Sequence, residues 1–123
     1  MILLDTNILI EIYRDNIVIA SVVDNMQDIA VCDVVRAELF YGARNKHELQ
    51  EISADLVGLT VFSILPQISK MAVNLVKTYC LSHKLEFADA LIAAIAIHHN
   101  VELFTLNRKD FAYIPNLKLY EPE

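Results

Sequence analysis

The sequence alternates short apolar runs with longer stretches of helical pattern along its whole length. Five runs rich in β-branched and apolar residues have strand length, and they cover residues 2–4, 29–32, 60–64, 101–105 and 117–120. Helical patterns lie between them, over residues 6–14, 16–25, 34–42, 47–57, 67–83 and 88–98. Strands that alternate with helices form a parallel sheet with helices on both faces. The sequence therefore predicts an α/β fold, a three-layer sandwich around a central parallel sheet of about five strands.

Local signals at the ends of the helices support these boundaries. Asp33 is predicted to cap the helix over 34–42, Gly42 to end it, and Pro66 to stand in the first turn of the long helix. With two glycines, three prolines and no repeats, the chain shows no linker. We therefore expect a single domain over residues 1–123.

The chain is more apolar than most soluble proteins. Its apolar residues amount to 55% and its mean hydropathy is +0.40, so we expect part of the apolar surface to bind a second copy or another protein. The longest apolar run, 88–97, is too short to cross a bilayer and contains an aspartate. No secretion signal is recognisable at the N-terminus, which predicts no membrane association and a cytoplasmic location. Cys32 and Cys80 are predicted to be reduced thiols in the core.

Acidic and polar residues follow two of the predicted strands. Asp5 comes directly after the first strand, and Asn107 and Asp110 follow the fourth within a turn. In an open parallel sheet, ligands bind beyond the carboxyl ends of the strands. These residues should therefore share one edge of the sheet.

Two further acids lie in helical stretches with apolar neighbours. On a helical wheel Glu38 falls near the middle of an apolar arc, so we expect it to face inward, where a charge needs a partner. Asp89 stands near the start of a helix predicted to be buried all round, and the helix dipole there should keep its carboxylate ionised.

Each acid also has a simpler interpretation. Asp5 and Asp89 could cap helices, Glu38 could pair with a buried arginine, and Asp110 could lie in a solvated turn. Together the four favour a metal site, because two carboxylates about 6 Å apart repel by roughly 3 kcal/mol at an effective dielectric near 20. Oxygen ligands without histidine or cysteine favour Mg²⁺ or Mn²⁺. Such a cation can activate water and stabilise the charge that builds on a phosphodiester.

The net charge of −6 argues against a nucleic-acid substrate, which proteins usually bind with a basic surface. A bound metal ion and a basic partner could compensate for part of this charge. Arg44, Lys46, Arg108 and Lys109 flank the predicted edge and could contact RNA phosphates, although for any one of them a solvated charged rim is the better interpretation.

Four segments of the chain together resemble the PIN-domain ribonucleases, specifically the VapC-like toxins of type II toxin–antitoxin pairs. The segments are ILLDTNILIE, RAELFYGA, ADALIAAIAI and TLNRKDF followed by IPNLKLY, and they occur in the expected order over nearly the whole chain. The resemblance implies that Asp5, Glu38, Asp89 and Asp110 form an acidic metal site, with Thr6 and Asn107 supporting it. It further implies endonucleolytic RNA cleavage that depends on Mg²⁺ or Mn²⁺, a homodimer, and inhibition by a cognate antitoxin whose tail covers the active site. One departure is Ala88, where many relatives carry a second acid, which would weaken the binding of a second metal ion.

Two other functions remain open at this point. The sequence disfavours a haloacid-dehalogenase-like phosphatase, which needs a second aspartate two positions after the first, where this chain has Asn7. It also disfavours a receiver domain, which needs an aspartate at the end of its third strand, because none is found over residues 60–65. A non-catalytic partner-binding domain would leave the acids without a metal. Binding of Mn²⁺ that depends on Asp89 would separate it from an enzyme.

Overall fold

The computed structural model describes residues 1–122, which form one five-stranded parallel sheet with helices packed around it. The strands are β1 (Ile2–Leu4), β2 (Ile29–Cys32), β3 (Thr60–Phe62), β4 (Glu102–Phe104) and β5 (Lys118–Leu119). The helices are α1 (Thr6–Tyr13), α2 (Ile17–Asp24), α3 (Asp33–Tyr41), α4 (Lys46–Leu56), α5 (Pro66–His83) and α6 (Phe87–His99), and a 3₁₀ turn, η1, covers Arg108–Asp110. The predicted α/β class and the order of elements are confirmed.

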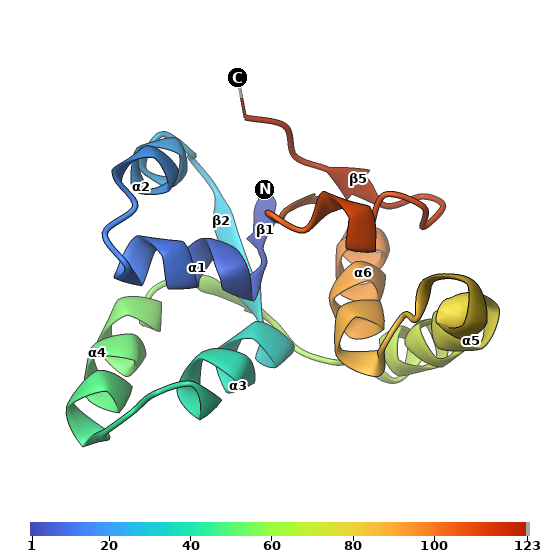
Figure 1. Cartoon of the computed structure of the whole chain (residues 1–123), viewed down its shortest axis with the longest axis horizontal. Helices are drawn as coiled ribbons and strands as arrows, with labels where there is room; N and C mark the ends of the chain where they lie inside the picture. The colour runs from blue at the N-terminus through green and yellow to red at the C-terminus, as the bar shows by residue number, and fades with distance from the viewer. Residues whose placement is uncertain (123) are drawn as a thin grey trace.

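The strand order is β3-β2-β1-β4-β5. The chain thus winds outward from β1 to β3 and then returns to the other side of β1 with β4. Helices α1 and α2 lie to one side of β1 and β2, and α5 and α6 lie side by side on the other (Figure 1). In a sheet of this kind the ligand site lies at the carboxyl ends of the two strands where the winding reverses, here β1 and β4.

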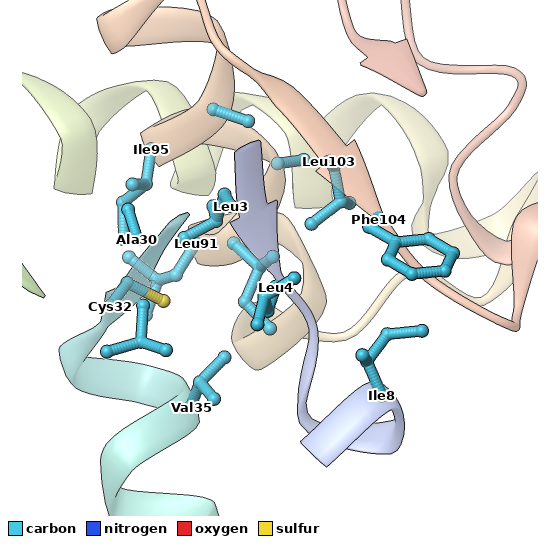
Figure 2. Packing of buried hydrophobic residues seen from close by; sticks show 14 of the residues in the cluster. Leu3, Leu4, Ile8, Ala30, Cys32, Val35, Leu91, Ile95, Leu103 and Phe104 are labelled. Atoms are coloured by element: carbon cyan, nitrogen blue, oxygen red, sulfur yellow. The ribbon is translucent and has the colours of Figure 1, made fainter. Parts of the chain in front are cut away.

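The core forms where α6 packs on the central strands. All residues of α6 from Ala90 to Ala96 are buried, which confirms a helix buried all round. Figure 2 shows Leu91 and Ile95 of α6 packed near Leu3 of β1 and Ala30 of β2. Small alanines let this helix approach the sheet closely, and the tight packing fixes where its first turn lies.

Two local predictions come out differently. Pro66 does begin α5 and Gly42 does end α3, but Asp33 is the first residue of α3 rather than its cap and pairs with Arg36 instead. Cys32 is buried as expected, whereas Cys80 is exposed on α5, whose buried residues are Ile68 and Ala72. No helix among residues 1–122 is both long and apolar enough to cross a membrane.

Candidate active site at the carboxyl ends of β1 and β4

Asp5 lies at the reversal point of the sheet and is 5% exposed. Its backbone N–H donates to the carbonyl of Phe104 at 2.9 Å, so β1 and β4 stay paired up to this residue. Its Oδ1 accepts a hydrogen bond from the backbone N–H of Thr6 at 2.8 Å, and its Oδ2 accepts one from Oγ1 of Thr105 at 2.7 Å. Asp5 therefore caps α1 and also presents a firmly oriented carboxylate at the edge of the sheet.

Burial raises the pKa of Asp5 above its ordinary value. The hydrogen bonds from Thr105 and Thr6 lower the pKa, and the negative charges of Glu38 and Asp110 raise it again. Asp5 is thus held in a site where other carboxylates oppose its ionisation.

Asn7 and Thr105, which the sequence analysis did not select, hold the carboxylate of Asp5 in place. Asn7 donates from Nδ2 to Oδ2 of Asp5 at 3.4 Å and to Oγ1 of Thr105 at 3.3 Å, while its Oδ1 accepts from the N–H of Leu106 at 3.2 Å. The only sequence signal for Asn7 and Thr105 is that they are polar residues close to the end of an apolar strand. Asn107, predicted as a supporting residue, donates its backbone N–H to Oγ1 of Thr105 at 3.1 Å.

The expectation that Glu38 faces the interior is wrong. Glu38 is exposed, because the buried face of α3 is formed by Val35 and Leu39, and Tyr41 of the supposed apolar arc is 93% exposed. The carboxylate of Glu38 turns toward α1 instead, and its Oε1 accepts a hydrogen bond from Oγ1 of Thr6 at 2.7 Å. No ion pair joins it to an arginine among residues 1–122.

Asp89 is half-buried in the first turn of α6, and the cap of that helix is Glu86 rather than Asp89. Burial raises the pKa of Asp89 to about 6, with further contributions from the charges of Asp5, Asp110 and Glu38. We expected the helix dipole to keep this carboxylate ionised. Desolvation and repulsion from the neighbouring acids outweigh the dipole in setting this pKa, so the carboxylate is ionised at neutral pH but less readily than the dipole alone would predict.

Asp110 lies in the exposed turn η1, close enough to raise the pKa of both Asp5 and Asp89. Four acids from four separate segments therefore act on one another electrostatically. None of the four forms an ion pair with a cationic side chain among residues 1–122. In the same range, no three acidic, histidine or cysteine side chains come close enough to enclose a metal ion by themselves.

The four predicted RNA-contacting cations differ in their surroundings. Arg44 forms an ion pair with Glu48 at 2.7 Å, and Arg108 pairs with Glu121 at 2.9 Å while also donating to the carbonyl of Tyr120. Lys46 and Lys109 are exposed and make no ion pair within the described part of the chain.

A groove borders the acids on the side of Glu38. It lies between α1, α3 and α4 and has a volume of about 510 Å³. Its lining combines apolar residues such as Ile10, Leu39 and Ile52 with the charged pair of Arg44 and Glu48.

Comparison with known proteins gives consistent matches over the whole chain. The family model described as PIN domain matches residues 2–117. Ribonuclease VapC19 of Mycobacterium tuberculosis is 30% identical, covering 96% of this chain and 98% of that protein. A toxin–antitoxin complex from Klebsiella pneumoniae contains a chain that is 31% identical, with a TM-score of 0.82 and coverage of 98% of this chain and 99% of that one. A chain of VapBC-1 from nontypeable Haemophilus influenzae is 25% identical, with a TM-score of 0.83 and coverage of 98% of both chains.

Proposed function

The chain belongs to the PIN-domain family, and on that premise we propose that it is a VapC-type endoribonuclease, dependent on Mg²⁺ or Mn²⁺, that acts as the toxin of a toxin–antitoxin pair. The observation that carries the proposal is the group of four uncompensated carboxylates around the carboxyl ends of β1 and β4. Repulsion among these carboxylates destabilises the folded protein unless a bound ligand neutralises their charge. Such a group of acids is therefore typical of a functional site.

The residues that would hold the cation are Asp5, Glu38, Asp89 and Asp110. Their donor atoms are all carboxylate oxygens, which suits a hard divalent cation. Mg²⁺ commonly keeps several of its waters and takes only one or two protein carboxylates directly. The open spacing of the four acids fits such a hydrated ion better than a closed cage. When bound, the ion would supply an acidified water molecule and positive charge for the phosphodiester.

The surrounding polar residues would fix the geometry of this site. Thr105 and the N–H of Thr6 hold the two oxygens of Asp5, and the hydroxyl of Thr6 holds one oxygen of Glu38. Thr6 thus links Asp5 and Glu38. The second carboxylate oxygen of Glu38 has no hydrogen-bond partner among the described residues. Such partners orient metal ligands and commonly change metal affinity by a factor of roughly 10 to 100.

The proposal includes protein partners and a location. The groove beside Glu38 offers apolar and charged contacts to a segment of a cognate antitoxin, which would cover the acids from that side. Exposed apolar residues on α5, among them Val73 and the 95% exposed Leu81, support a homodimer. RNA would approach past Lys46 and Lys109, with Arg44 and Arg108 first releasing their carboxylate partners. We place the protein in the cytoplasm, where its RNA substrate is found.

The test compares inducible expression of the wild type with Asp5→Asn, followed by mapping of RNA 5′ ends. The expected result is growth arrest and new 5′ ends with the wild type and with the matched control Asp28→Asn, which changes an exposed aspartate outside the site, but not with Asp5→Asn. With purified protein, EDTA should abolish cleavage and Mn²⁺ should restore it. Equal toxicity of Asp5→Asn, or the absence of new ends, would overturn the proposal.

Calorimetry separates this function from that of a non-catalytic partner-binding domain. We expect the wild type to bind Mn²⁺ and Asp89→Asn to bind it far more weakly. A wild type that binds no Mn²⁺ would favour the partner-binding domain.

A further inference from the structure

Three aromatic rings from two separate segments meet beside the acids. His83 and Tyr79 lie on the last turns of α5, and Tyr113 lies in the segment between η1 and β5. The rings of His83 and Tyr113 stack with their centroids 3.7 Å apart and their planes 13° from parallel. The ring of Tyr79 lies at a steep angle to both, with its centroid 5.8 Å from that of His83 and 5.0 Å from that of Tyr113. These contacts hold the stacked pair in a fixed orientation.

The solvent-facing member of the cluster is His83. It is exposed, whereas Tyr79 and Tyr113 are half-buried. The Nδ1 atom of His83 is joined to Oγ of Ser82 by a hydrogen bond of 2.7 Å, which further restricts rotation of the imidazole. Tyr113 stacks on one face of this ring, and the exposure of His83 lets solvent or a flat partner reach the rest of it.

The cluster adjoins the proposed catalytic site. Tyr113 follows Asp110 by three residues, and the carboxylates of Asp110 and Asp89 both act electrostatically on its hydroxyl group. Lys84, directly after His83, is exposed and forms no ion pair within residues 1–122. The ring cluster therefore lies close to the acids through Tyr113, and an exposed lysine follows His83 directly in the sequence.

We propose that His83, Tyr79 and Tyr113 form a stacking platform for one unpaired base of the RNA substrate, with Lys84 near an adjacent phosphate. The proposal rests on the proposed ribonuclease function and adds to it a contact that selects one unpaired base beside the cleavage site. A base within a duplex is stacked on its neighbours and cannot lie on the imidazole, whereas an unstacked base in a loop can. Cleavage would thereby be directed to single-stranded segments, independently of the acids that perform the chemistry.

The experiment uses the full chain carrying Asp5→Asn, so that bound RNA stays intact. The probes are short single-stranded RNAs in which 2-aminopurine occupies each position in turn, and stacking is read from the quenching of its fluorescence. We expect quenching at one position, abolished by adding His83→Ala and retained with His83→Phe, which keeps a flat ring. The dissociation constant should rise on the order of tenfold with His83→Ala. In the chain with Asp5 intact, the same substitution should raise KM for a single-stranded substrate and leave kcat nearly unchanged.

The outcomes distinguish failure of this inference from failure of the proposed function. If the intact chain cleaves RNA while His83→Ala leaves quenching and KM unchanged, the cluster only packs the loop against α5 and the inference is wrong. If the intact chain cleaves no RNA and none of the probes binds, the proposed function fails and the platform fails with it. Circular dichroism of His83→Ala shows whether the exposed substitution leaves the fold intact.

Discussion

Replacing Asp89 by asparagine should stabilise the metal-free protein while abolishing its activity. The pKa of Asp89 is raised from 3.8 to about 6, so the folded state binds a proton more tightly than the unfolded state does. The favourable contribution of protonated Asp89 to the free energy of unfolding is therefore fully present below pH 3.8. It is lost as the pH rises through about 6. At neutral pH the ionised wild type carries the full penalty, and a neutral amide of the same shape does not.

The size of this gain follows from the shift. About two pKa units correspond to about 3 kcal/mol, and partial exposure of Asp89 reduces this to about 1–2 kcal/mol through solvent screening. For a chain of this size, that is a rise in Tm of about 5 °C at pH 7.5 in EDTA. At pH 4.5 the wild-type carboxyl is mostly protonated in the folded state, so the gain should shrink to about one third.

The assay is thermal unfolding of wild type, Asp89→Asn and the control Asp28→Asn at both pH values, with EDTA or with Mn²⁺. Mn²⁺ should raise the Tm of the wild type and of Asp28→Asn but have little effect on Asp89→Asn. An Asp89→Asn protein that is no more stable than wild type in EDTA at pH 7.5 would refute the idea that repulsion among the acids destabilises the fold. A gain of equal size at pH 4.5 would refute the assignment of the effect to ionisation.

Three further substitutions test the supports of the site and the core. Thr105→Val removes the 2.7 Å hydrogen bond to Asp5 and should lower the free energy of unfolding, measured in urea, by about 1–3 kcal/mol, with Thr105→Ser close to wild type. An unchanged midpoint would show that the bond contributes nothing. Thr6→Val removes the contact to Glu38 and should raise the Mn²⁺ concentration for half-maximal cleavage on the order of tenfold, with Thr6→Ser as the reference. An unaltered metal requirement would contradict the linking role of this hydroxyl. Ile95→Ala empties a fully buried position under the sheet and should cost about 2–5 kcal/mol, while cleavage per folded molecule stays near wild type; a large loss of kcat would instead tie α6 packing to the site.

Hydrophobic periodicity predicted the elements of the fold well, because it is a local property that each segment carries by itself. The helices over 6–14 and 88–98 appear as Thr6–Tyr13 and Phe87–His99, within a residue at each end. The run over 60–64 is shortened to Thr60–Phe62, since β3 lies at the edge of the sheet with a single neighbour to pair with. Placement of Asp5 at a strand end followed from the same local pattern.

Which side chains meet was settled only by the tertiary structure. The direction of Glu38 depends on how α3 lies between α1 and α6, and a helical wheel drawn for α3 alone contains no information on its neighbours. The contact of Thr105 with Asp5 joins residues 100 positions apart, and the stacking of His83 on Tyr113 depends equally on how α5 packs beside α6. The sequence alone therefore determined which acids stand at the ends of elements, through the periodicity and length of each segment. The packing of those elements decided the partners, burial and pKa of each acid, because these depend on distances between segments that no local pattern encodes.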